Sequence, residues 1–239
     1  MYKALRHQTL PDACASQLRR MILAGEFAPG DRLPPERELA DRFDVNRVTL
    51  RSALARLAAS GLVEVRQGRG YTVRDYRSVG GPDLLPGLAE LARERGEMVV
   101  VAADLFLVRR HLAAAVLQRL AERPPADISG VAAAVSAFAA LAAARAHPDD
   151  LAEADADILA ALLAATESPV LQLCLNPIRA VMAELPELRV AMYRDPGGNV
   201  LGWQALLAWL AAPDLSGVAD IAALLAARDA DTIAALEPS

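Results

Sequence analysis

The chain has 239 residues, 54% of them hydrophobic and only 4% aromatic, so its core must be built mainly from Leu, Ala and Val. That length fits two modest domains or one large one, and an abundance of Ala and Leu favours helices. The two cysteines, Cys14 and Cys174, lack the spacing of a disulfide framework or a zinc site. The N-terminus is polar and no apolar run reaches the roughly 18 residues of a membrane helix, so we expect a cytoplasmic protein without a membrane partner.

The net charge of −5 is divided unequally along the chain. Residues 1–76 contain 13 Lys and Arg against 9 Asp and Glu, which is +4, whereas the remaining residues contain 12 against 21, which is −9. Such a division indicates that the first part meets a polyanion. Chance variation in surface charge gives similar divisions, so the charge supports a nucleic-acid partner only together with the motifs below.

Three helices are predicted near the N-terminus, over residues 11–24, 35–43 and 46–60. The apolar residues of each segment recur at helical spacing, which gives each helix one face for a core. Asn46 is placed to cap the third helix, because its side chain can accept a hydrogen bond from an N–H of the first turn. Gly61 then ends that helix.

A β-hairpin is predicted directly after the third helix. Val63 and Val65 alternate with charged residues, which is the pattern of a strand, and the alternation resumes at Tyr71. Gly68 and Gly70 supply the tight turn between the two strands. The order helix, helix, turn, helix, hairpin is that of a winged helix-turn-helix.

The rest of the chain contains no convincing strand and is predicted to form a helical bundle. We therefore expect a mainly α protein, with a winged helix-turn-helix domain over residues 1–76, a linker over 77–82 and a helical effector-binding and dimerisation domain over 83–239. Prolines mark the breaks between helices, because proline lacks an N–H and clashes with the preceding turn. The expected helices cover residues 83–96, 98–122, 128–146, 149–166, 169–184, 186–193, 199–211 and 215–236.

The third helix and the hairpin tip carry the side chains expected to bind DNA. A recognition helix reads base edges with residues near its N-terminus, and here its outer face presents Arg47, Val48 and Arg51, with Asn46 and Thr49 at the margin. Arginine bonds guanine bidentately, and Asn or Thr contacts bases or phosphates. The wing offers Gln67, Gly68 and Arg69, whose glycine permits a close approach and whose arginine neutralises phosphate or enters a minor groove.

The stretch LPPERELADRFDVNRVTLRSALARLAASGLVEVRQGRGYTV, within residues 11–74, resembles the GntR family of bacterial regulators. The family pattern is LPSERELA, then VSRTTVREAL, then LxxEGLVxxxxGxGxxV. The resemblance implies double-stranded operator DNA as the partner and a homodimer on a palindromic site. Carried over by position, it implies DNA contacts from Arg37, Asn46, Arg47, Thr49, Arg51, Gln67 and Gly68.

Three residues depart from the family pattern in this region. Pro35 stands where a helix-capping serine is usual, and Asn46 and Val48 stand where Ser or Thr is common. The operator sequence is therefore expected to differ from the one usual in the family.

The C-terminal part resembles the all-helical FadR-type effector domain of the same family. The segment LFLVRRHL fits an early helix with a central arginine, Arg109, and DADILAALLAATESPVL fits a segment that begins with Asp155. Many such domains hold a metal with one Asp and three His, but Leu159 stands at the first histidine position. A metal site needs several converging ligands, so we expect neither metal nor cofactor.

The expected effector site is an apolar pocket between helices of this bundle. Its candidate residues are Arg109, Asp155, Leu159, Met182, Tyr193 and Trp203, with Trp209 as a further large side chain. Arg109 is the first candidate to bind a carboxylate, a phosphate or CoA, and Arg179 and Arg189 are further candidates. The resemblance implies a fatty acyl-CoA or another lipophilic carboxylate as the effector, and a small polar carboxylate is the alternative.

Other classes of protein find less support in the sequence. The chain contains no GxSxG elbow, Walker loop or GxGxxG after a strand, so we expect a regulator and not an enzyme. A ligand-independent architectural DNA-binding protein remains the stronger rival, in which the Ala-rich domain serves only to dimerise. Release from DNA by an effector would separate the two.

Overall fold

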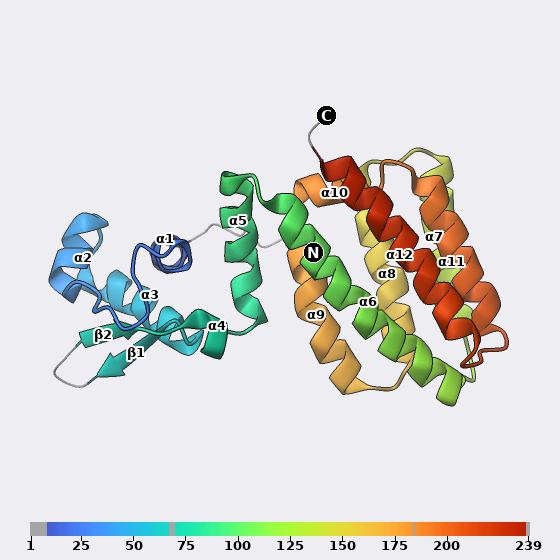
Figure 1. Ribbon diagram of the computed structural model, residues 1–239, viewed down its shortest axis with the longest axis horizontal. Helices are drawn as coiled ribbons and strands as arrows, with labels where there is room; N and C mark the ends of the chain where they lie inside the picture. Colours follow the sequence, from blue (N-terminus) through green and yellow to red (C-terminus); the bar gives the residue numbers. More distant parts are fainter. Residues whose placement is uncertain (1–8, 67–69, 184, 238–239) are drawn as a thin grey trace, which may run out of the picture. The chain divides into compact units, whose positions relative to one another are not determined.

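The computed structural model describes residues 9–66, 70–183 and 185–237, and it divides the chain into two compact units, residues 1–95 and 96–239. The observed fold class is the predicted one, mainly helical, with a three-helix winged domain followed by a helical bundle (Figure 1). None of the described helices is long and apolar enough to cross a membrane.

The N-terminal unit begins with the predicted winged helix-turn-helix. Strands β1 and β2 pair antiparallel, with Val63 opposite Val73 and Arg66 opposite Gly70. The segment before the second helix also bonds to this sheet, since the N–H of Leu33 donates to the carbonyl of Tyr71 at 3.0 Å. The elements are α1 (Leu10–Ala24), α2 (Glu36–Arg42), α3 (Arg47–Ala59), β1 (Val63–Arg66) and β2 (Gly70–Val73).

Local sequence explains where these helices begin and end. Helix α1 ends at Gly25, whose φ of 84° lies in the left-handed region that glycine adopts without a steric penalty. Helix α2 follows Pro35, which gives it no side-chain cap. The apolar faces meet in one core whose fully buried members include Leu18, Leu50, Leu54, Leu57 and Leu62.

The domain boundary lies further along the chain than the sequence indicated. The expected linker at 77–82 overlaps α4 (Tyr76–Val79) and the 3-10 turn η1 (Pro82–Leu84), and α5 (Leu85–Arg95) packs on α1. Leu84 and Leu91 are buried in the core of the winged domain, and Arg20 pairs with Glu94 at 2.6 Å. These contacts place residues 83–95 in the N-terminal unit rather than in the bundle.

The C-terminal unit is a bundle of helices that run along one another around an apolar core (Figure 1). Phe138, Leu120, Leu151 and Ile158 are among its almost fully buried side chains. Several helices begin at a proline, as expected where the missing N–H costs nothing, although Pro177 lies inside α9. The elements are α6 (Met98–Glu122), α7 (Ser129–Ala143), α8 (Pro148–Ala165), α9 (Pro169–Ala183), α10 (Pro186–Met192), α11 (Pro196–Leu210) and α12 (Gly217–Leu236).

Candidate functional site

Helix α3 exposes the side chains that the sequence places at DNA. Arg47 and Val48 stand in solvent at its first turn, with Val48 78% exposed, and Thr49 is half-buried beside them. Leu50 and Leu54, on the opposite face, are fully buried. The core therefore fixes the helix so that its N-terminal residues face outward, which is the arrangement required for reading a major groove.

The oxygen and the nitrogen of the Asn46 side-chain amide have different roles. Its Oδ1 accepts a hydrogen bond from the N–H of Thr49 at 2.8 Å, so Asn46 is the predicted N-cap of α3. The amide nitrogen of an asparagine can only donate. It therefore remains as a donor, which suits a phosphate oxygen or a base acceptor.

Arg51 is paired within the protein and is not idle in solvent. Its Nε donates to Oε2 of Glu36 at 2.7 Å, although the Arg51 side chain is 68% exposed. An exposed pair of this kind contributes little stability. Glu36 therefore orients the Arg51 guanidinium beside the exposed face of α3.

The remaining DNA-contact candidates fall into two groups. Arg37 is exposed at the start of α2, close along the chain to Glu36. On the hairpin, Arg66 pairs with Glu64 at 3.3 Å. Gln67, Gly68 and Arg69 lie outside the described residues, so the wing tip stays a prediction from the sequence.

Removing the cap on α3 is expected to cost stability. Asn46→Ala leaves the N–H of Thr49 without its acceptor and should lower the free energy of unfolding by about 1 kcal/mol, as measured by urea denaturation. Asn46→Asp is the matched control, because aspartate caps equally well but brings a negative charge toward DNA. It should keep the stability and lose operator affinity; equal stability of the alanine variant would contradict the capping role.

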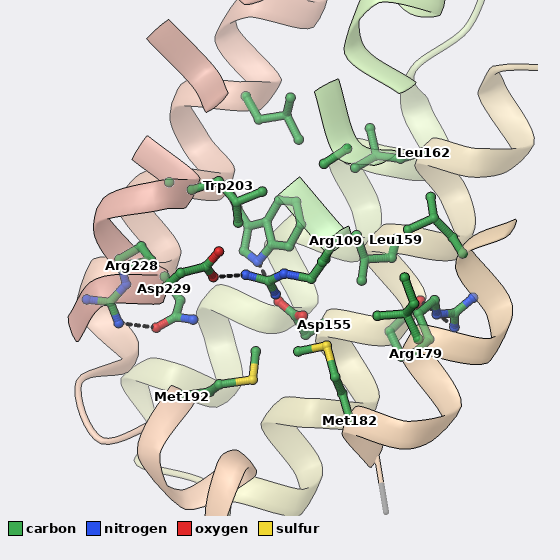
Figure 2. Close-up of a pocket in the computed structure, with 18 of the residues that line it drawn as sticks. Arg109, Asp155, Leu159, Leu162, Arg179, Met182, Met192, Trp203, Arg228 and Asp229 are labelled. Atoms are coloured by element: carbon green, nitrogen blue, oxygen red, sulfur yellow. Dashed lines mark hydrogen bonds and ion pairs between the residues drawn. The ribbon is translucent and has the colours of Figure 1, made fainter. Parts of the chain in front are cut away.

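A cavity of about 210 Å³ in the C-terminal unit brings the predicted effector residues together. Its lining is mostly apolar, and it includes all six candidates: Arg109, Asp155, Leu159, Met182, Tyr193 and Trp203. They come from helices α6, α8, α9 and α11 and from the residue that follows α10. In Figure 2 the Arg109 guanidinium lies in the middle of the cavity, with Trp203 above Asp155 and with Met182 and Met192 at one end. Trp209, also predicted, is not among the lining residues; its Nε1 donates to the carbonyl of Asp214.

Asp155 is buried and bonded by two aromatic donors. Nε1 of Trp203 donates to its Oδ1 at 2.7 Å, and the Tyr193 hydroxyl donates to the same carboxyl group. Burial raises the pKa of Asp155, against the opposing effect of the nearby Arg109. Burial likewise raises the pKa of Tyr193 far above its usual range, so its hydroxyl stays a donor.

Arg109 is tied to a residue that sequence reasoning missed, Asp229 of α12. Asp229 is 1% exposed and accepts hydrogen bonds from Arg109 and, at 3.0 Å, from Nη1 of Arg110. Asp229 stands in the polar run R-D-A-D of residues 228–231, which is typical of a solvent-exposed turn of helix. The sequence nevertheless contained a signal that Asp229 faces the bundle. Asp229 lies four residues after Leu225 and three before Thr232, so the three residues share one helical face, and Thr232 is buried.

The other guanidinium groups at the cavity have different partners. Arg189 pairs with Asp149 at 2.7 Å, Arg228 donates to Oδ1 of Asn199 at 2.6 Å, and Arg179 donates to the carbonyl of Ala156 at 3.2 Å. Within the described part of the chain, the buried Nε atoms of Arg109, Arg179 and Arg228 have no hydrogen-bond partner. Buried polar atoms are usually satisfied, so these three Nε atoms are unsatisfied donors within residues that line the cavity.

No group of three or more His, Cys, Asp or Glu in the described residues is placed to hold a metal ion. Leu159 lies one helical turn after Asp155 and contributes an apolar side chain to the cavity. The donor set at this place therefore consists of Asp155, aromatic donors and guanidinium groups.

Comparisons with known proteins agree with the winged domain. Residues 11–73 match the family described as Bacterial regulatory proteins, gntR family. Residues 11–73 therefore form a winged DNA-binding domain of the GntR type. The gntR family is one of transcriptional regulators and not of enzymes, and its members bind operator DNA.

The individual relatives match different shares of the chain. The HTH-type transcriptional regulator Mce2R of Mycobacterium tuberculosis is 49% identical over 81 residues, 34% of either chain, so the match spans about a third of that relative. The fatty acid metabolism regulator protein of Escherichia coli O1:K1 is 29% identical over 164 residues, 69% of this chain and 65% of that protein. A solved structure of Lar, which controls expression of the Listeria monocytogenes agr system, is 17% identical with a TM-score of 0.59 over 97% of this chain and 98% of that one. The last likeness supports the fold alone.

Proposed function

We propose that this protein is a cytoplasmic, ligand-responsive transcriptional regulator. Its winged domain binds operator DNA as part of a homodimer, and its helical unit senses a lipophilic carboxylate. The observation that carries the proposal is the cavity, in which an apolar lining surrounds buried guanidinium groups with unused donors.

The DNA-binding part of the proposal rests on α3. Exposed Arg47 and Val48 occupy its first turn, directly after the exposed cap Asn46, where a recognition helix meets base edges. Val48 suits a thymine methyl group, since apolar side chains make that contact in the major groove. Each protomer supplies one such helix, so two protomers would read two halves of a palindrome.

The chemistry of the effector follows from the lining of the cavity. Leu159, Leu175 and Leu206 offer an environment for a hydrocarbon chain, and Arg109 offers a charged partner for a carboxylate. A volume of about 210 Å³ lies below the roughly 300–1,000 Å³ of pockets for drug-sized ligands. A fatty acid of short or medium chain therefore fits better than a long-chain acyl-CoA, whose nucleotide part would have to remain outside.

Regulation follows because binding of the effector and binding of DNA are thermodynamically linked. An effector shifts the protein toward the arrangement that it binds more tightly. If that arrangement places the two recognition helices at the wrong spacing for successive major grooves, DNA is released. The name of the Escherichia coli relative, a fatty acid metabolism regulator, supports the same class of effector for this chain.

The test is fluorescence anisotropy of the protein on its own promoter DNA at fixed salt. The titrants are fatty carboxylates from butanoate to palmitate, oleoyl-CoA, and polar carboxylates such as citrate. Release by fatty carboxylates supports the proposal, and release by citrate alone moves the effector to the polar class. Tight DNA binding that no titrant alters contradicts effector sensing and favours the architectural rival.

A further inference from the structure

The cavity already contains a carboxylate of the protein itself at its central arginine. Asp229 projects from α12 and is 1% exposed, while Arg109 and Arg110 of α6 are 13% and 28% exposed in their side chains. Both guanidinium groups bond the same carboxylate, one to each oxygen. Two guanidinium groups therefore share one carboxylate.

The Arg109 guanidinium is held by an aromatic ring as well as by Asp229. Its Cζ lies 4.8 Å from the centroid of the Phe106 ring, which supports one face of the guanidinium. Its buried Nε has no partner among the described residues. Figure 2 shows the group between Asp229 on one side and Asp155 on the other, and Asp155 takes its own hydrogen bonds from Trp203 and Tyr193.

A carboxylate that enters this cavity meets a competitor. Breaking a buried ion pair is costly when it leaves a charge unpaired. Here the exchange leaves none unpaired, because Asp229 keeps Arg110 while the incoming carboxylate takes Arg109.

We propose that Asp229 is an internal competitor for the effector, which occupies Arg109 in the empty protein and yields it to the effector carboxylate. This inference rests on the proposed function, since it requires a carboxylate effector in the cavity. Asp229 thereby sets the affinity of the site for anions. It also ties α12 to α6, the first helix after Gly96, so the exchange alters a link between two helices of the bundle.

The test measures dissociation constants of octanoate and of uncharged octanol by isothermal titration calorimetry on the full-length protein. Asp229→Asn removes the competing charge and keeps the shape, so octanoate should bind about tenfold more tightly and octanol within about twofold of wild type. Asp220→Asn is the matched control. It removes a carboxylate from the same helix at an exposed position outside the cavity lining, and should leave both constants unchanged.

A second variant protects the test against a folding defect. Arg110→Gln leaves Arg109 as the only charged partner of Asp229. The Asp229 carboxylate should then bind Arg109 more strongly, and octanoate should bind about fivefold more weakly. In the Asp229→Asn background the same change should have a much smaller effect. This thermodynamic cycle separates competition from a general loss of charge.

The outcomes distinguish the two proposals. Octanoate affinity that is unchanged by Asp229→Asn, or that moves together with octanol, overturns the competitor while leaving the carboxylate site in place. Failure of wild-type protein to bind any fatty carboxylate from butanoate to palmitate overturns the proposed function itself.

Discussion

Phe138→Ala is expected to lower the free energy of unfolding of the C-terminal unit by about 3–5 kcal/mol. Phe138 on α7 is fully buried, and its ring centroid lies 6.2 Å from that of Tyr193. The truncation removes the apolar contacts of the ring and leaves a void in a core that has few aromatic side chains. Urea denaturation followed by circular dichroism measures the change.

The matched control is Phe138→Leu, which keeps most of the volume and should cost less than about 1.5 kcal/mol. The Phe138 ring lies against Tyr193, and the Tyr193 hydroxyl donates to Asp155 in the cavity lining. The alanine variant should therefore also weaken binding of octanoate in the cavity. A loss of stability below about 1 kcal/mol for Phe138→Ala would mean that the bundle closes over the void, contrary to a tightly packed core.

Arg47→Ala is expected to weaken binding to the specific operator by about 1–3 kcal/mol, or roughly 5–150-fold, if Arg47 forms a bidentate contact with guanine. Arg47 is exposed at the first helical position of α3, and it makes no hydrogen bond or ion pair within the described residues that would restrain it. Anisotropy titrations at fixed salt measure the loss on operator DNA and on a scrambled sequence of equal length.

Arg42→Ala provides the matched control for charge. Arg42 is an exposed residue of α2 that pairs with Glu38 at 2.6 Å, and its removal lowers the charge of the domain by the same amount. It should weaken binding to both DNA sequences slightly and equally, as a phosphate-level effect. An Arg47→Ala loss that is equal on operator and scrambled DNA would assign Arg47 to the backbone and not to a base.

The winged domain could be predicted closely because its signals are local. Asn46 caps α3 by a bond to a residue three positions away, and Gly61 ends the helix with a φ of 74°, so each boundary is written in adjacent residues. The end of the domain could not be predicted in this way. Leu84 and Leu91 follow a stretch that reads as a linker, and only their burial in the core of the winged domain reveals where they belong.

In the helical unit, the sequence indicated which residues line the cavity but not how they are paired. Arg109 was expected to bind the effector, whereas its guanidinium is hydrogen-bonded to Asp229, which lies 120 positions away in the chain. No spacing rule connects such distant residues, because the pair forms only when α6 and α12 pack together. Trp209 was misplaced for a similar reason, since a large side chain alone does not say which way its helix turns it.

The hydrogen bond between Trp203 and Asp155 gives the cavity an optical signal of its own. The chain has only two tryptophans, and the second, Trp209, bonds the carbonyl of Asp214 away from the cavity lining. Trp209→Phe therefore leaves a single indole whose Nε1 is held 2.7 Å from a buried carboxyl oxygen. Emission from that indole will follow the polarity and charge around Arg109 without any label, so stopped-flow mixing can time the arrival of a ligand in the cavity separately from the departure of DNA.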